Sequence, residues 1–565
     1  MEDLHRVQFS LCRILTIWHP NLAAYAEHAE RRILTFRHAK GGFRLNSGDS
    51  SNKPKRAPAP TRNQMKLEEK IAEFERRHTF GKSLTAYLSR NRIKVVRVEQ
   101  GLQGRWSLFA VLPTSTAEMF DIDRELLFLV TDYEAVEPRI LNDLQSQMRN
   151  NARVEDEIAV LISRDGNARR LVRMRAGEAA ILTIEGQNLP GEVPDFRVIV
   201  SEMLESVDHF NVTTPITSPS AFFGRQRDIS SVRRFLAQGQ HVGIFGLRKA
   251  GKSSLLNRVS VLERELGSIV VNLDLNEYFG TPRRFRAGIV RSLSEELARN
   301  KIIVPKLRSL RSHGRDDFIN EYWMSDLDSL LNAIPASRNV IFVIDEIDSA
   351  LPSRILSRAE ADEEVGLLRA LSQLRAFIQK RQSRGQIPPV ILSAGVDPSL
   401  FERASVRGIT NPLFQFSALK FIEPMDREEL QDMIRTLGKR TGLKFRSHEV
   451  IDELMEEYGG HPLLTRQACS YVHRNRPRGV VPYQVQKSDV QKAFAAKGPG
   501  SPLEHARAIP ESFAEWFPQE STVLSERWSN LQFDPMETSG LEHAISYGLL
   551  HDNGSVRMRA LTRTT

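Results

Sequence analysis

The stretch HVGIFGLRKAGKSSLL, residues 241–256, decides the fold class of this chain. A short apolar run ends at Phe245, and Gly246, Gly251, Lys252 and Ser253 follow it with the spacing G-x₄-G-K-S. Between a buried strand and a helix, this spacing is typical of a phosphate-binding P-loop. The glycines let the backbone turn and approach phosphates, and the helix N-terminus adds positive potential. The stretch therefore predicts an α/β fold built around a P-loop.

The residues of the loop have separate expected roles. Lys252 is expected to bridge the β- and γ-phosphates of ATP during catalysis, and the Ser253 hydroxyl to ligate Mg²⁺. ATP and Mg²⁺ are therefore the expected cofactors. The competing interpretation is a glycine-rich turn that binds nothing. The residues expected to contact the nucleotide are Gly246, Leu247, Arg248, Lys249, Ala250, Gly251, Lys252, Ser253 and Ser254.

A second apolar run, VIFVI at 340–344, ends in Asp345 and Glu346. An unbroken apolar run is typical of a central parallel strand that is covered on both faces. Ligands bind at the carboxyl ends of such strands. We expect Asp345 to hold Mg²⁺ from its outer shell, and Glu346 to orient and deprotonate the attacking water. The alternative for Glu346 is a solvated carboxylate at a strand end.

A third strand is expected at 389–392, with Ser393 at its end. If this strand lies between the other two, the Ser393 hydroxyl faces the γ-phosphate and acts there as a catalytic sensor of hydrolysis. The alternative is a serine that opens a turn before Gly395.

The composition indicates a soluble protein of several domains. A chain of 565 residues is too long for one hydrophobic core, and 41% hydrophobic with 26% charged residues is ordinary for globular proteins. No apolar run approaches the roughly 18 residues that cross a bilayer, so no membrane contact is expected. The two cysteines exclude a disulfide framework and favour the reducing cytoplasm. The net charge of +9 permits contact with nucleic acid without demonstrating it.

The N-terminal part of the chain divides at two changes of composition. Residues 1–63 form an extension and a Ser/Gly/Pro/Lys-rich linker. Residues 64–215 alternate strand and helix patterns, which predicts a small α/β domain of unknown role. Its Gly81-Lys82-Ser83 imitates the end of a P-loop, but no strand precedes it and Arg76 replaces the required glycine. A second linker, rich in Thr, Pro and Ser, is expected at 211–220.

From about Ser218 onward the sequence resembles the STAND and AAA+ ATPases, especially the bacterial and archaeal branch near the origin-recognition ATPases. The motifs that carry this resemblance are FFGR at 222–225 with Asp228-Ile229, GLRKAGKSSLL at 246–256 and DEID at 345–348. The resemblance implies that the FFGR motif closes on the adenine side, so Phe223 and Arg225 are expected to contact the nucleotide. It places the ATPase core at 216–425.

Beyond the core, the resemblance implies a helical lid at 426–500 and a winged-helix-like domain at 501–565, and whether its wing is complete is left open. Gly460-His461-Pro462 resembles the G-x-P motif of the lid, which implies that Pro462 contacts the nucleotide. The alternative without a nucleotide contact is a loop that separates two helices. Arg407 is the best candidate for an arginine finger.

These features favour a switch ATPase, in which the nucleotide state controls the attached domains and slow hydrolysis acts as a timer. The first alternative is an initiator- or loader-like ATPase that grips double-stranded DNA with its winged helix. The second is a nucleotide-binding adaptor with little turnover, against which Glu346 argues. Assembly into a homo-oligomer is left open.

Overall fold

The computed structural model describes residues 62–174, 178–189, 191, 193–278, 281–310, 317–351, 366–406, 408–529 and 538–563. The chain divides into a unit Met1–Asn63 and a compact unit Gln64–Thr565, and the description below concerns the second unit. None of the described helices combines the length and the apolar character that crossing a bilayer demands.

The first part of this unit is a mixed α/β domain around a sheet with strand order β1-β2-β3-β4-β5. The first three strands pair antiparallel and the last three parallel. They are β1 Lys94–Gln100, β2 Trp106–Val111, β3 Leu126–Val130, β4 Ile158–Ser163 and β5 Ala180–Glu185. The small α/β domain that the sequence predicts is therefore confirmed.

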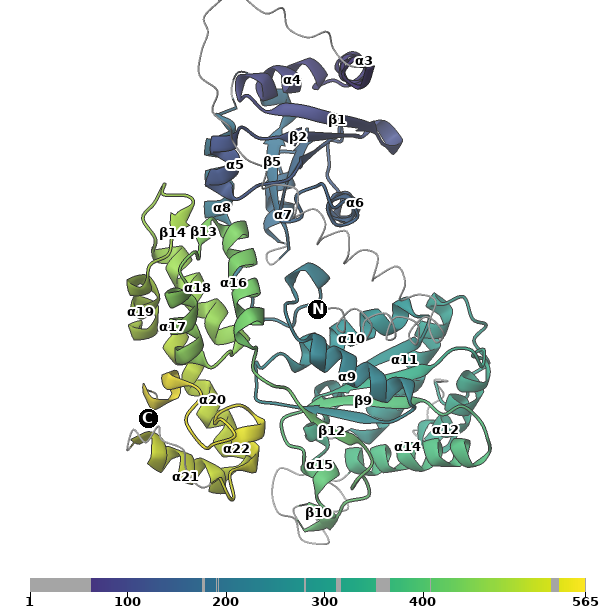
Figure 1. Ribbon diagram of the computed structural model, residues 1–565. Helices are drawn as coiled ribbons and strands as arrows, with labels where there is room; N and C mark the ends of the chain where they lie inside the picture. The colour runs from purple at the N-terminus through teal and green to yellow at the C-terminus, as the bar shows by residue number, and fades with distance from the viewer. Residues whose placement is uncertain are drawn as a thin grey trace, which may run out of the picture. The chain divides into compact units, whose positions relative to one another are not determined.

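Helices cover both faces of this sheet (Figure 1). One face packs against α3, α4 and α8, and the other against α6 and α7. The helices are α3 Arg62–Arg77, α4 Gly81–Arg90, α5 Thr114–Phe120, α6 Pro138–Arg149, α7 Ala168–Arg173 and α8 Phe196–Ser206.

The P-loop-like Gly81 has a packing role instead. It is the first residue of α4, and among the described residues the element before it is the helix α3. A Cβ added at Gly81 would lie 2.6 Å from the carbonyl oxygen of Phe74 in α3. The glycine is therefore required where the two helices meet.

The second part contains a parallel sheet with strand order β12-β6-β9-β8-β7. Its strands are β6 Val242–Phe245, β7 Ile269–Asp274, β8 Val340–Asp345, β9 Val390–Gly395 and β12 Ala418–Phe421. β9 lies between the P-loop strand β6 and the carboxylate strand β8, which is the arrangement on which the expected role of Ser393 depends. This is the α/β core of a P-loop NTPase, which confirms the predicted fold class for the core.

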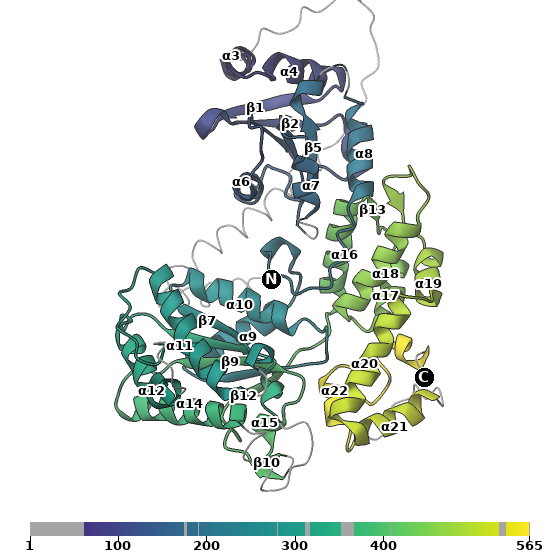
Figure 2. The same ribbon diagram turned by 180° about the vertical axis from the view of Figure 1, so that it is seen from behind.

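The apolar run of β8 explains why this sheet is buried on both sides. Ile341 and Val343 pack with α9 and α10, whereas Phe342 and Ile344 pack with α11, α12 and α14. Side chains alternate along a strand, so an unbroken apolar run fills two cores at once. The three layers can be followed in Figure 1 and, from behind, in Figure 2. The helices are α9 Gln226–Ala237, α10 Lys252–Glu265, α11 Pro282–Arg299, α12 Asp317–Asn332, α14 Gly366–Ser383 and the short α15 Ser399–Glu402.

Helices dominate the chain after the core. Asp426 and Glu429 form a capping box at the start of the first one, which satisfies backbone amides that a helix leaves unpaired. The four helices are α16 Arg427–Thr441, α17 His448–Tyr458, α18 Pro462–Asn475 and α19 Lys487–Ala495. The loop with Gly460 and His461 separates α17 from α18, as its proline predicts.

The C-terminal residues form three helices, α20 Pro502–Trp516, α21 Pro518–Ser529 and α22 Glu542–Ser546. A single antiparallel bridge joins Leu550 to Val556 across the turn at 551–554. Among the described residues of this region, this bridge is not extended into a pair of strands. The winged helix therefore stays a prediction.

Candidate nucleotide site

The P-loop joins β6 to α10, and its two glycines are needed for different reasons. A Cβ at Gly246 would lie 2.2 Å from the Cγ2 atom of Ile422, which follows β12. Gly251 has a φ of 104°, a left-handed conformation that side chains oppose, and it caps α10. Gly246 therefore serves close packing, and Gly251 serves the turn into the helix.

Lys252 is buried at the first position of α10. Its Nζ donates hydrogen bonds to the carbonyl oxygens of Gly246 at 2.9 Å and of Leu247 at 3.1 Å. Burial lowers the pKa of Lys252, while the charges of Glu346 and Asp348 act in the opposite direction. The ammonium group therefore lies between the loop and the carboxylates that follow β8.

The turn after β8 orients Glu346. This residue has a φ of 51°, unusual for a residue other than glycine, and its amide donates to Asp345 Oδ1 at 3.0 Å. Burial raises the pKa of Glu346, the charge of Lys252 opposes this shift, and Asp348 adds to it. A raised pKa in a cleft suits a group that exchanges a proton during a reaction.

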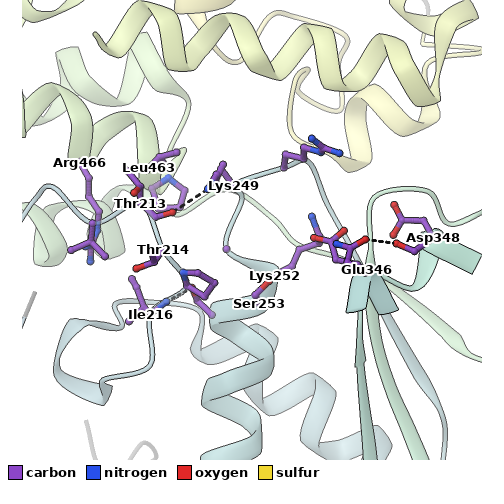
Figure 3. Close-up of a pocket in the computed structure, with 18 of the residues that line it drawn as sticks. Thr213, Thr214, Ile216, Lys249, Lys252, Ser253, Glu346, Asp348, Leu463 and Arg466 are labelled. Atoms are coloured by element: carbon purple, nitrogen blue, oxygen red, sulfur yellow. Dashed lines mark hydrogen bonds between the residues drawn. The ribbon is translucent and has the colours of Figure 1, made fainter. Parts of the chain in front are cut away.

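These residues share a pocket of about 680 Å³, within the roughly 300–1,000 Å³ of small-molecule sites. Figure 3 shows Glu346 and Asp348 on one side, with Lys252 and Ser253 next to them. The expected site residues that line the pocket are Arg248, Lys249, Gly251, Lys252, Ser253, Ser254, Glu346 and Pro462. The other lining residues are Val212, Thr213, Thr214, Pro215, Ile216, Asn276, Asp348, Ser349, Leu351, Leu463, Arg466, Glu515 and Trp516.

The remaining expected residues lie outside this lining. Asp345 is the last residue of β8, and Gly246, Leu247 and Ala250 belong to the body of the loop. Arg407, the candidate arginine finger, lies outside the described residues.

The expected position of Ser393 is wrong. β9 continues to Gly395, so Ser393 lies inside the strand. Its side chain is fully buried, and its Oγ donates to the carbonyl oxygen of Val242 in β6 at 3.4 Å. The hydroxyl therefore contacts a neighbouring strand and does not line the pocket.

Phe223 and Arg225 do not line the pocket, but they contact residues of the P-loop and of the pocket lining. Arg225 is buried and donates to the carbonyl oxygens of Glu423 and, at 2.9 Å, of Ala250. The ring of Phe223 lies 5.9 Å from the guanidinium carbon of Arg466, which does line the pocket. Arg225 thereby ties the P-loop to the end of the core.

Sequence reasoning missed the pocket wall formed by residues 212–216, which it interpreted as a plain linker. The amide of Ile216 donates to Ser254 Oγ at 2.9 Å, and Lys249 Nζ donates to the carbonyl oxygen of Thr213 at 3.1 Å (Figure 3). Apolar Val212 and Ile216, within a polar stretch, were the available signal.

The loop before α18 leads into residues that also line the pocket. Gly460 has a φ of 84°, and its carbonyl oxygen accepts the amide of Met425 at the end of the core, at 3.0 Å. His461 is buried and caps α18, and Pro462 follows as its first residue. Pro462 and Leu463 therefore line the pocket together.

Comparison with known proteins agrees with this geometry. Residues 216–484 match the model of a family described as Novel STAND NTPase 1. This segment is a STAND NTPase domain. The predicted resemblance is thus confirmed, and membership of an NTPase family implies that the pocket binds a nucleotide. The STAND domain contains the P-loop, the carboxylates after β8 and the Pro462 loop, whereas Trp516 lies beyond it.

Three solved structures illustrate how distant the relatives are. The chain is similar to the Walker-type ATPase PABY2304 of Pyrococcus abyssi, at 16% identity and a TM-score of 0.42, covering 63% of this chain and 99% of that one. Cdc6p from Pyrobaculum aerophilum is 13% identical with a TM-score of 0.33, and the match covers 62% of this chain and 93% of that one. The ORC2 protein of Aeropyrum pernix is 14% identical with a TM-score of 0.36, and the match covers 60% of this chain and 89% of that one. No curated protein matches the chain. Such low identities do not transfer the activity of these proteins.

Proposed function

We propose that this chain is a Mg²⁺-dependent ATPase of the switch type, in which the bound nucleotide controls the domains attached to the STAND domain. One observation carries the proposal. The P-loop, the carboxylates after β8, the connection at 212–216, the Pro462 loop and the C-terminal Trp516 all line the same pocket. A ligand there touches the core, the Pro462 loop, the C-terminal helices and the connection that leads to the N-terminal α/β domain.

The phosphate end of the pocket has the groups that phosphoryl transfer requires. The N-terminus of α10 and the Lys252 ammonium supply positive charge for the β- and γ-phosphates. Glu346 lines the same end and acts as the general base. It takes a proton from water as the oxygen of that water bonds to the γ-phosphorus and the bond to the leaving ADP breaks.

The residues present fit a magnesium ion. Mg²⁺ prefers oxygen ligands, and it is usually held by one or two protein groups, nucleotide phosphates and water. Ser253, with its hydroxyl at the start of α10, and Asp345, at the end of β8, would hold it. When bound, the ion supplies positive charge that stabilises the transferring phosphoryl group.

The switch follows from contacts that a nucleotide makes in one arrangement and not in another. A ligand shifts a conformational equilibrium only by its differential affinity for the two states. The connection at 212–216 leads to the N-terminal α/β domain, whose last helix is α8, and Trp516 belongs to the C-terminal helices. We propose that closing of the lid, residues 426–500, on the nucleotide is transmitted through these two contacts.

Three variants test the proposal. Lys252→Ala should lose ATP binding, because the phosphates lose their buried cation. Glu346→Gln should bind ATP and fail to hydrolyse it. Lys82→Ala is the matched control, because Lys82 sits in the P-loop-like sequence of α4 and is exposed there. The measurements are ATP affinity by calorimetry and phosphate release with Mg²⁺. Equal turnover by the wild type and all three variants would refute the assignment.

A further inference from the structure

The pocket has a second end, away from the carboxylates. Figure 3 shows Thr213, Leu463 and Arg466 on the side opposite Glu346 and Asp348, with Lys252 and Ser253 between them. If the chain is an ATPase, the γ-phosphate lies by Glu346 and the β-phosphate by Lys252. The base of the nucleotide must then lie toward Arg466. This inference therefore rests on the proposed function.

Arg466 is held firmly at this end. It lies in α18, one turn after Pro462, and is only 3% exposed. Its Nη2 donates to the carbonyl oxygen of Ala221 at 2.9 Å, and the guanidinium carbon lies 5.9 Å from the ring of Phe223. These contacts fix one edge of the guanidinium group, and Arg466 is among the residues that line the pocket.

The other terminal nitrogen of Arg466, Nη1, is buried and has no hydrogen-bond partner within the described part of the chain. Burial lowers the pKa of Arg466 to about 10, so the group is still protonated at neutral pH and all its donors carry hydrogen. A buried donor without an acceptor is costly, so each one in a native protein requires an explanation, such as a catalytic role or a bound ion or water. Arg466 therefore offers a donor that the fold itself does not use.

The neighbouring polar groups are already engaged. The carbonyl oxygen of Thr213 accepts Lys249, and the amide of Ile216 donates to Ser254. We propose that Arg466 determines base specificity by donating a hydrogen bond from Nη1 to a ring nitrogen of a purine base. Purines carry such acceptors at N1, N3 and N7, and the apolar side chains of Val212, Ile216 and Leu463 provide flat contact for the ring.

Removal of single atoms from the ligand tests this without altering the protein. The affinity of the wild type is measured by calorimetry for ATP and for its 1-deaza, 3-deaza and 7-deaza analogues, each lacking one acceptor. One analogue should bind about fivefold to a hundredfold more weakly, the range that corresponds to the cost of an unsatisfied buried donor. The other two should bind within about twofold of ATP.

Substitution of the side chain completes the test. In Arg466→Met, ATP and the sensitive analogue should bind equally, because the donor is gone. Arg474→Met is the control, since Arg474 is exposed on the same helix, and it should keep the full discrimination. Circular dichroism melting checks that each variant folds. If Arg466→Met does not fold, the analogue series with the wild type still tests whether a ring nitrogen of the base accepts a hydrogen bond in the pocket.

Each other outcome overturns the inference. Equal affinity of the wild type for all four nucleotides excludes a ring-nitrogen contact. A penalty that persists in Arg466→Met assigns the contact to another residue. Equal weakening of ATP and of inorganic tripolyphosphate by Arg466→Met places the side chain on the phosphates. Failure of the folded wild type to bind ATP at all refutes the proposed function instead.

Discussion

Replacement of Arg225 by methionine should loosen the P-loop from the rest of the core. The side chain is buried and donates to the carbonyl oxygens of Ala250, in the P-loop, and of Glu423, after β12. Its own amide donates to Glu429 Oε1 in the lid helix α16 at 2.7 Å. The methionine keeps most of the volume and the backbone contact, and it removes only the charged donors.

The magnitude follows from the groups left behind. Two partly buried carbonyl oxygens lose their partner, at about 1–3 kcal/mol each. Burial lowers the pKa of Arg225, which Asp228 and Glu429 only partly counter, so removing this charge returns some desolvation energy. Asp228 also keeps Lys420, 3.0 Å away, as a partner. We expect a net loss of about 2–4 kcal/mol in the stability of the core.

Urea denaturation measures this loss as a shift of the midpoint. Arg227→Met is the control, because Arg227 is exposed only two residues away, in the helix α9 that Arg225 precedes as N-cap. ATP affinity should fall as well in Arg225→Met, since Ala250 directly precedes Gly251 in the loop. An Arg225→Met protein that unfolds at the same urea concentration as Arg227→Met would show that the hydrogen bonds of the Arg225 side chain do not contribute to the stability of the core.

Two further predictions concern the lid and the C-terminal helices. A non-hydrolysable ATP analogue should protect residues 211–220 from limited proteolysis in the wild type and much less in Pro462→Gly, which loosens the lid loop; an unchanged wild-type pattern would leave the switch unsupported. Burial lowers the pKa of His543, but hydrogen bonds with Glu402 and Glu520 outweigh this and raise it to about 9 from 6.5. Because the folded pKa is the higher one, this stabilisation is complete below pH 6.5 and lost as the pH rises through 9. The urea midpoint of the wild type should fall over that range relative to His543→Gln, and parallel pH profiles would contradict it.

The sequence predicted the strands β6, β8 and β9 because each of them contains a short apolar run. The expected strand at 340–344 differs from β8 by one residue. The end of β9 was misjudged because Ser393 and Gly395 are small and resemble the start of a turn. Gly395 is required for another reason: a Cβ there would lie 2.3 Å from Oδ1 of Asp348, so the glycine makes room for a carboxylate.

The far side of the pocket could not be predicted in the same way. Arg466 and Trp516 belong to helices whose orientation depends on packing across the whole unit, and no local spacing connects them to the P-loop. By contrast, the residue spacing of the motif at 246–253 is enough to predict the geometry of the P-loop. Residues gathered from distant helices leave no such mark in the sequence.

The wall formed by residues 212–216 decides how the chain can be cut for experiments. Residues 211–220 have the composition of a linker, which suggests a fragment boundary there, and the STAND match begins at residue 216. A fragment starting there lacks Thr213, whose carbonyl oxygen accepts Lys249. It also lacks Phe210, whose ring packs 6.1 Å from that of Phe445 in the lid. A fragment that begins at Val207, directly after α8, retains both, and any exchange of the N-terminal domain should keep residues 207–216 together with the STAND domain.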